Sequence, residues 1–575
     1  MTIGEAIDRL GVEEWDDPSP SFLRWPPDVF GIAAYLLRER GAYAECVSPQ
    51  PRTRSDCPIP WFPRRGWRWH VRDVGQRWGE NVTGPPSGEV IGCWNLLRES
   101  SHLLHGMRDL RPSGVWQALA TMLAIADEAC AMAAIPGQAT LREPDLLLDD
   151  GPPRPAPTPK PTINSMRYLG PIALQASVDV SEHALSSNSI SPPPSTLCRA
   201  IPPEIAVVLP KLRTPQSGLT IRSMSHHLSL HSGMDIVPLW SPAPPRHHRT
   251  SGRRAYNIMI LPVPYTIRPS QFRPVVLADP KDSSHTVPMF TFEHDPDGLS
   301  PQRLGALLER AAAQCGRITG LVLPEGAMSS QRARELFIRP SFKPDIDFLV
   351  CGTSDGPEHD GSLGRNAALV RVRREKRWQE FMQDKHHRWK IDDAQSRMYH
   401  LASTLDPTHN WWEAIEPRER TLRFIELDET CVFTVLICED LARPDPVGDI
   451  VRSVGPNLVI ALLQDGPQLR ARWPARFAGG LADDPGSSVL SVTSLGMCTL
   501  SKPLERLNDP PSRVVAMWRQ PGADAREIAL PVGAHALVLT VVVESRTEWA
   551  ADGRDDDSTT CGLTLGAVHA VSLPE

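Results

Sequence analysis

Length, composition and charge set the first limits on what this chain is. Its 575 residues exceed what one hydrophobic core ordinarily supports, so two to four domains are expected. A hydrophobic share of 41% and a charged share of 22% are typical of a globular protein, while 58 prolines are about twice the usual proportion. The net charge of −7 excludes a general attraction to nucleic acid or anionic lipid, and no run reaches the ~20 apolar residues of a membrane span.

The cysteines and the N-terminus indicate a reducing compartment. Eleven cysteines are an odd number, widely scattered and without any C-x-x-C pair, which argues against a disulfide framework or a zinc site. The first eight residues are acidic and amphipathic, unlike a secretory signal. We therefore expect a cytoplasmic protein without a membrane segment, and neither a metal nor another cofactor.

The N-terminal part of the chain is expected to be helical. Residues 1–140 contain two runs, 30–40 and 115–129, that are rich in Ala and Leu and carry apolar residues at helical spacing. They predict a helical domain of unknown role. Residues 141–195 are predicted to be a Pro-rich linker, because their run 149–161 can form neither a helix nor a central strand.

The next segment, residues 196–250, contains one strand-like run, 205–210, and is too short to fold alone. We expect it to pack on the domain that follows. From about residue 255, apolar strand-like runs alternate with helix-like runs such as 304–313, which predicts an α/β domain over residues 251–545 with a buried sheet. Residues 546–575 are rich in aspartate and are expected to form a polar surface tail.

The thiol of Cys438 is the first candidate for chemistry. The run 431–437 is apolar and rich in β-branched residues, as in a buried strand, and it ends on Cys438 followed by Glu439 and Asp440. A cysteine that only fills a core belongs inside a strand, whereas strand ends are where α/β folds present reactive groups. This position suggests a nucleophile.

A catalytic thiol needs a base and a group that stabilises an oxyanion. Glu325 ends the strand-like run 320–325 and so repeats the position of Cys438 at a strand exit. Lys385 lies in the run 383–389, shortly after the strand-like stretch that begins at Asn366. The candidates therefore occur in the order glutamate, lysine, cysteine.

This ordered set resembles the nitrilase, or carbon–nitrogen hydrolase, superfamily. That family has its glutamate in a Pro-Glu strand end, its lysine in a Lys-x-His context and its cysteine in Ile-Cys-x-Asp. The matching residues here are Pro324-Glu325, Lys385-His386-His387 and Ile437-Cys438-Glu439-Asp440. The resemblance covers residues 255–545 and also includes the run 455–460, Ser494-Leu495-Gly496, Trp473 and Arg476.

The resemblance implies a four-layer αββα sandwich, preceded by the mainly helical N-terminal domain and the Pro-rich linkers. It also implies an amidase-type hydrolase of a small-molecule amide, usually a homodimer. Glu325 would act as the base, Lys385 would stabilise the oxyanion and lower the pKa of the thiol, and the backbone N–H of Glu439 would assist. The Cys-Glu-Asp form is most similar to the glutamine-hydrolysing branch.

Some residues in the site have competitors. Lys385 lacks the Tyr-Arg that usually precedes the family's lysine, and Lys390 is a second candidate five residues on. The family often has a second glutamate that orients the lysine, and Glu413 is preferred here over Glu416.

Other readings of the chain stay open. Cys438 would be a buried structural thiol if the chain were an inactive scaffold. The stretch 202–215 and the sequence around Cys438 also resemble the nitrilase-like domain associated with antiviral reverse transcriptases, which suggests an accessory role in defence.

The basic and aromatic run 61–78 offers nucleic-acid binding as a further alternative, although packing together with a solvated face is favoured. The histidine pairs 226–227, 247–248 and 386–387 lack Cys or carboxylate partners at ligand spacing and are interpreted as solvated loops.

Overall fold

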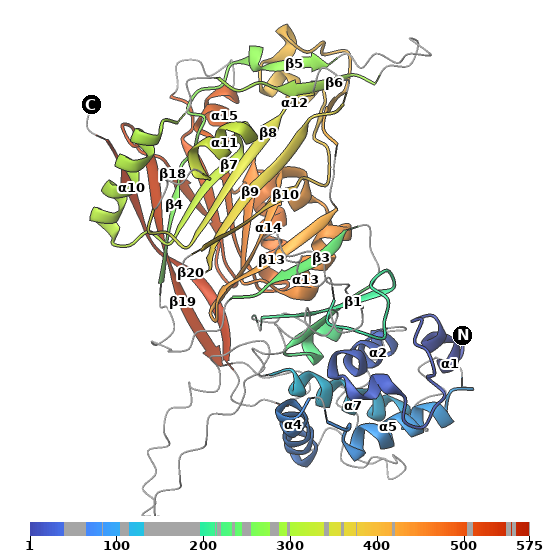
Figure 1. The fold of residues 1–575 in the computed structure, drawn as a ribbon. Helices are drawn as coiled ribbons and strands as arrows, with labels where there is room; N and C mark the ends of the chain where they lie inside the picture. Colours follow the sequence, from blue (N-terminus) through green and yellow to red (C-terminus); the bar gives the residue numbers. More distant parts are fainter. Residues whose placement is uncertain are drawn as a thin grey trace, which may run out of the picture. The chain divides into compact units, whose positions relative to one another are not determined.

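A computed structural model of the chain separates into two compact units, each described here by itself (Figure 1). The first contains residues 1–252, 450–455 and 545–561, and the second contains 253–449, 456–544 and 562–575. The structure describes residues 1–38, 65–82, 84–103, 114–131, 196–212, 214, 220–232, 236–243, 255–275, 287–295, 299–338, 344–357, 362–374, 377–416, 420–502, 510–547, 554 and 559–573. The predicted linker 141–195 and the pair His247-His248 lie outside the described residues.

The first unit is built around helix α7 (Val115–Ala129), whose residues are all buried except Gln117. Its Ala- and Leu-rich sequence explains this position, because a helix that is apolar on every side needs partners all round. Its partners are α2, α4 and α5. Helices α4 and α7 approach so closely that a Cβ atom on Gly79 would lie 2.5 Å from the backbone oxygen of Ala129. The described helices of this part are α1 (Ile3–Asp8), η1 (Ser21–Arg24), α2 (Pro26–Arg38), α4 (Arg65–Glu80), α5 (Gly88–Glu99), α7 and η4 (Ile221–Met224).

The described residues of the segment 196–250 belong to the first unit, and its expected packing on the second stays a prediction. Strands β1 (Ala206–Pro210) and β2 (Leu228–Ser232) form an antiparallel pair, and β3 (Val237–Ser241) follows. Ala206 and Leu230 belong to the same hydrophobic core as the helices.

The second unit contains two large sheets. In the first sheet the central strands β4, β7 and β8 are parallel and the flanking strands are antiparallel. Its order is β10 (Arg377–Asp384), β9 (Arg365–Arg374), β8 (Phe348–Asp355), β7 (Gly320–Met328), β4 (Ala255–Ile260), β19 (Ala536–Thr547) and β20 (Thr559–Val571).

In the second sheet the strands β14, β15 and β16 are parallel to one another. Within this unit the order is β18 (Arg526–Ala529), β17 (Val514–Arg519), β16 (Ser488–Thr493), β15 (Leu458–Leu463), β14 (Cys431–Ile437) and β13 (Thr421–Asp428). A small third sheet has the order β11 (Lys390–Ile391), β12 (Trp411–Glu413), β6 (Met289–Phe292) and β5 (Phe272–Val275).

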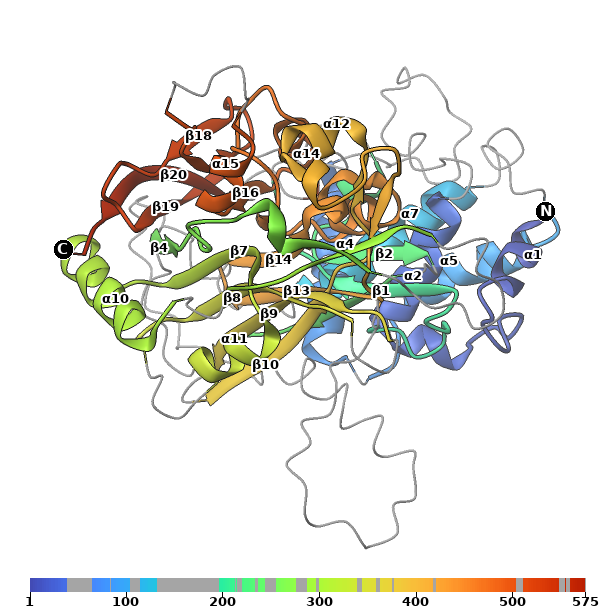
Figure 2. The same cartoon turned by 90° about the horizontal axis from the view of Figure 1, so that it is seen from above.

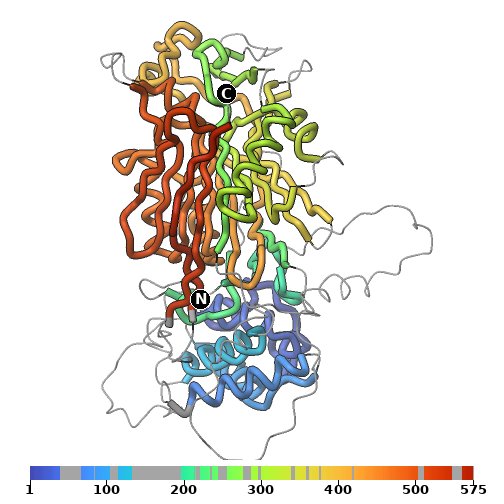
Figure 3. The backbone as a smooth tube through the Cα atoms, turned by 90° about the vertical axis from the view of Figure 1, so that its left-hand side faces the viewer, coloured from blue at the N-terminus to red at the C-terminus, as the bar shows by residue number. Residues whose placement is uncertain are grey.

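The two large sheets pack face to face (Figures 2 and 3). One hydrophobic cluster draws buried residues from both of them, and the rings of Phe348 and Phe433 lie 5.2 Å apart across it. Helices α10 (Pro301–Cys315) and α11 (Ser330–Phe337) pack in a separate cluster against strands of the first sheet, and α14 (Trp473–Asp483) contacts β16 and β17. The unit is therefore an α/β fold. Its remaining described helices are η5 (Pro269–Gln271), α12 (Asp393–Met398), η6 (Leu401–Ser403), η7 (Cys438–Ala442), η8 (Pro444–Gly448) and α15 (Leu495–Leu500), while α13 (Asp449–Val454) lies mostly in the first unit.

The C-terminal residues 546–575 differ from the expected polar tail, because they contain the 13-residue strand β20 at the edge of the first sheet. Cys561 and Leu563 are buried in this strand, and Leu563 belongs to the core between the sheets. Such an apolar alternation is typical of an edge strand, and the aspartates before it hid that pattern in the sequence. Among the described residues, none of the helices combines the length and the hydropathy that a membrane crossing requires.

Candidate active site

The structure places Glu325 in an irregular stretch of β7. The pairing of β7 with β8 breaks after Leu323 and resumes at Met328, which frees the intervening residues from the regular ladder. Gly352 of β8 makes room for this stretch, since a Cβ atom there would lie 2.2 Å from the backbone oxygen of Pro324. The side chain of Glu325 is buried in this stretch, at 2% exposed, and β7 continues past it to Met328, so the strand does not end at Glu325 as the sequence predicted.

Cys438 follows β14 directly and begins the tight helical turn η7. Its φ angle is +46°, in the left-handed region that a non-glycine residue rarely occupies. Holding such a residue there costs about 1–3 kcal/mol, and residues of this kind cluster at functional sites. The cysteine is buried, and its thiol is close enough to Glu325 and Lys385 for their charges to act on its pKa.

Of the two candidate lysines, Lys385 is the one that contacts Glu325. It follows the last residue of β10 and is completely buried. Its Nζ atom donates to Oε1 of Glu325 at 2.8 Å and to Oε2 of Glu413 at 2.7 Å. The competing Lys390 is exposed on β11 and lies 5.9 Å from the ring centre of Trp412.

Glu413 joins the same group from the end of β12. Its Oε2 atom also accepts a hydrogen bond from the backbone N–H of Trp389 at 3.0 Å. Glu416, the alternative glutamate, is exposed. The structure thus brings together Glu325, Lys385 and Glu413 in one buried cluster, with Lys385 between the two carboxylates.

Two further residues support this cluster, and sequence reasoning did not identify their parts. Nδ2 of Asn366, on β9, donates to Glu325 at 2.8 Å and to Glu413 at 2.6 Å. The backbone N–H of Gln464, just after β15, donates to Oε2 of Glu325 at 2.6 Å. Each of these contacts joins strands that are far apart in the sequence. The only local signal that could have indicated these residues was a polar residue at a strand terminus.

Asp440 links the cysteine turn to the lysine loop. Its Oδ1 atom accepts from the backbone N–H groups of His386 and His387, both at 3.1 Å, and lies 2.8 Å from Nδ1 of His387. Since Asp440 is two residues after Cys438 and His386 is one after Lys385, these bonds fix the two loops against each other.

The side chain of Glu439 forms an ion pair, whereas its backbone N–H was expected to stabilise an oxyanion. Its carboxylate pairs with Arg443 at 2.9 Å, within the same turn. The backbone N–H that was expected to assist an oxyanion belongs to the residue directly after the thiol, and that assignment stays a prediction.

Burial and the ion pairs of Lys385 together set the pKa values in the site. Burial raises the pKa of Glu325, although the ammonium of Lys385 opposes the rise. Burial alone would lower the pKa of Lys385, but the carboxylates of Glu325 and Glu413 outweigh it and raise that pKa well above its usual value. The site therefore holds a stable ammonium between two carboxylates.

The pKa of Cys438 is shifted in the opposite direction from the prediction. The neighbouring lysine was expected to lower it, yet burial first and then the carboxylate of Glu325 raise it well above its usual value, with Lys385 only opposing the rise. A thiol removed from water favours its neutral form, and one cation shared by two carboxylates does not reverse that. The thiol is thus protonated at neutral pH.

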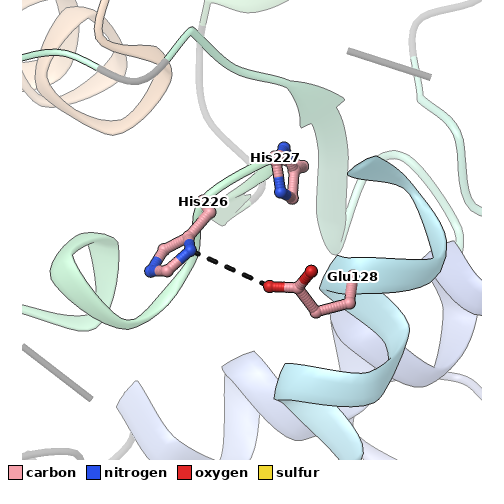
Figure 4. Close-up of side chains that lie close together, drawn as sticks. All are labelled: Glu128, His226 and His227. Carbon is pink, nitrogen blue, oxygen red and sulfur yellow. Dashed lines mark ion pairs between the residues drawn. The ribbon is translucent and has the colours of Figure 1, made fainter. Parts of the chain in front are cut away.

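A second group of ionisable side chains lies in the first unit, where His226 and His227 approach Glu128 (Figure 4). The histidines were interpreted as part of a solvated loop, which is wrong, since His226 is 1% exposed. Nδ1 of His226 lies 3.9 Å from Oε1 of Glu128. Arg554 lies 3.3 Å from the same oxygen of Glu128 and 3.0 Å from Oδ2 of Asp127, so one internal cation bridges the two carboxylates. We interpret the group as a structural ion network that ties the residue-554 segment to α7. His386 of the third pair is also buried.

The basic and aromatic run partly coincides with α4. Trp67 and Trp78 are buried in the helical core, while Trp69 is 59% exposed. Arg77 pairs with Asp73 at 2.8 Å. Residues 61–64 lie outside the described part, and nucleic-acid binding stays a prediction.

Comparisons with known proteins give limited information. No family model matches the chain, and no curated protein matches its sequence. Among solved structures, it is similar to Saccharomyces cerevisiae Nit3, a member of branch 10 of the nitrilase superfamily, with 13% identity and a TM-score of 0.29. The match covers 48% of this chain and 86% of that one.

Proposed function

We propose that this chain is a cysteine-dependent hydrolase that cleaves amide-type, non-peptide C–N bonds of small molecules through a thioester. In this proposal the second unit is the four-layer αββα sandwich of the nitrilase type. The observation that carries the proposal is the buried lysine whose Nζ lies 2.8 Å from Glu325 and 2.7 Å from Glu413, beside a cysteine held at positive φ.

The first half of the proposed reaction forms the thioester. Glu325 takes the thiol proton as Cys438 attacks the acyl carbon, which forms a C–S bond and turns the carbonyl into an oxyanion. The ammonium of Lys385 and the N–H of Glu439 stabilise that oxyanion. Glu325 then passes its proton to the leaving nitrogen, the C–N bond breaks and ammonia or an amine departs.

The second half releases the acyl group. Water loses a proton to Glu325 and attacks the thioester carbon, the C–S bond breaks, and Cys438 regains a proton from Glu325. Lys385 stays protonated throughout, which agrees with a pKa raised well above its usual value by two carboxylates. Asn366 and Glu413 position the glutamate and the lysine without touching the substrate.

The proposal is tested by incubating the full chain with a panel of small primary amides and measuring released ammonia. Cys438→Ala should abolish release, and mass spectrometry of the acid-quenched wild type should find an acyl adduct on Cys438. The matched control is Cys351→Ala, which removes another buried thiol of the same unit. Release that persists in Cys438→Ala would overturn the mechanism. A folded wild type that hydrolyses no amide and forms no adduct would favour the scaffold alternative.

A further inference from the structure

One buried carboxylate beside the candidate active site has no part in the mechanism above. Asp465 follows the end of β15, the strand that lies parallel to β14 with Leu462 opposite Ile437. Since Cys438 comes directly after Ile437, both strand ends deliver their next residues to the same edge of the sheet. Asp465 is 5% exposed.

The two oxygens of this carboxylate have different surroundings. Oδ1 accepts hydrogen bonds from the hydroxyl of Tyr399 and from Nη2 of Arg472, both at 2.5 Å. Oδ2 is buried and has no hydrogen-bond partner among the residues that the structure describes. A buried carboxylate oxygen without a donor is costly, so it is a candidate for binding a donor from outside the protein, such as water, an ion or a ligand.

The backbone holds Asp465 firmly in place. Its carbonyl oxygen accepts from the hydroxyl of Thr493 at 2.5 Å. The preceding residue, Gln464, donates its N–H to Glu325 at 2.6 Å. The free oxygen thus belongs to a residue fixed to the candidate base, and its charge reaches the thiol, where it contributes to raising the pKa of Cys438.

Three buried carboxylates near the thiol share two cations. Glu325 and Glu413 both contact Lys385, and Asp465 contacts Arg472. The carboxylate of Glu439 is closer in sequence to the thiol, but Arg443 already neutralises it at 2.9 Å. A substrate that brings a cationic donor would supply a partner for the free oxygen of Asp465.

We propose that Asp465 recognises a protonated amino group on the acyl side of the substrate, so that the preferred substrates are amides of amino acids. The ammonium donates to Oδ2 of Asp465 while the amide carbon lies at Cys438. This inference rests on the proposed function and adds that the preferred substrate carries a positive charge. Asp465 is a specificity residue in this scheme, and takes no proton during hydrolysis.

The test compares pairs of primary amides of equal size, one with a terminal amine and one with a methyl group. The pairs are glycinamide with propanamide, 3-aminopropanamide with butanamide, and 4-aminobutanamide with pentanamide. At pH 7 we expect kcat/KM for the amine to exceed that of its partner by about tenfold or more in at least one pair, as a charge-assisted hydrogen bond allows. The chain length with the largest preference for the amine indicates the spacing between Asp465 and the thiol.

Two variants separate recognition from folding. Asp465→Asn keeps the size and the oxygen that Tyr399 and Arg472 contact, and should lower kcat/KM about tenfold for the amine and less than about threefold for its neutral partner. Arg472→Met removes the internal partner but keeps the carboxylate, and should retain the preference for the amine. Equal rates within every pair, or an equal loss for both members in Asp465→Asn, would overturn the inference and leave the amidase intact.

A binding measurement keeps the inference testable if the proposed hydrolysis fails. Calorimetric titration of the Cys438→Ala chain with the same amide pairs needs no turnover. Tighter binding of an amine than of its neutral partner, lost in the Cys438→Ala/Asp465→Asn double variant, would support the inference. Equal binding, or no binding of either member, would reject it.

Discussion

Lys385→Met is the most informative single substitution in the site. It keeps the length and packing of the side chain but removes the ammonium that lies 2.8 Å from Glu325 and 2.7 Å from Glu413. Both carboxylates then stay buried without a cation. Breaking a buried pair in this way typically costs 3–5 kcal/mol, so we expect a loss of about that size in the stability of the second unit.

The sign of the pH dependence follows from Glu325. Burial already raises its pKa with the lysine present, and without the lysine that pKa rises further. A group whose pKa is raised on folding stabilises the fold at low pH and loses that contribution as pH rises through its folded pKa. The deficit of Lys385→Met should therefore be smaller near pH 4 than at pH 8.

The assay is thermal unfolding of the full chain at both pH values, followed through the transition assigned to the second unit. A loss of 3–5 kcal/mol corresponds to a fall of roughly 6–20 °C in Tm for a domain of this size class. The matched control is Lys390→Met, an exposed lysine five residues on, which should change stability by less than about 0.5 kcal/mol. Equal melting of Lys385→Met and the wild type at pH 8 would refute the reasoning.

Three further substitutions or conditions test the geometry. Cys438→Gly should raise the stability of the second unit by about 1 kcal/mol over Cys438→Ala in denaturant unfolding, since glycine accepts the φ of +46° without strain; no difference would count against strain at this turn. Alkylation of Cys438 by iodoacetamide should accelerate about tenfold per pH unit between pH 7 and 9 without a plateau, because burial raises its pKa well above the usual value; a plateau near pH 7 would show a thiolate at rest. Asp440→Ala should lower amide hydrolysis more than Asp445→Ala does, since only Asp440 binds the loop of His386 and His387; equal rates would remove its positioning role.

Glu325 and Cys438 could be picked out because an apolar run that stops at a reactive residue is a local signal. Only Cys438 directly follows a strand, since β7 continues past Glu325 to Met328. The choice of Lys385 over Lys390 was less secure, since both lie on one polar stretch, and only the position of each relative to β10 separates the buried lysine from the exposed one.

Contacts between distant strands were not predictable from one sequence. Asn366, Gln464 and Asp465 bind groups that lie on other strands or loops, and no spacing in the chain encodes those pairings. Charged residues also led to two wrong predictions. Aspartates before β20 concealed an edge strand, and a lysine near Cys438 suggested a lowered thiol pKa, although burial has the larger effect.

The raised pKa values of Glu325 and Cys438 are compatible with the proposed proton transfer. Removing water penalises the charged form of both groups, so burial shifts their pKa values in the same direction. The transfer from thiol to carboxylate exchanges one buried anion for another and does not create a new one. Lys385 stays close to whichever anion exists. A solvated glutamate would keep its low pKa and would be a poor base for so weakly acidic a thiol, which is a physical reason for burying the whole set.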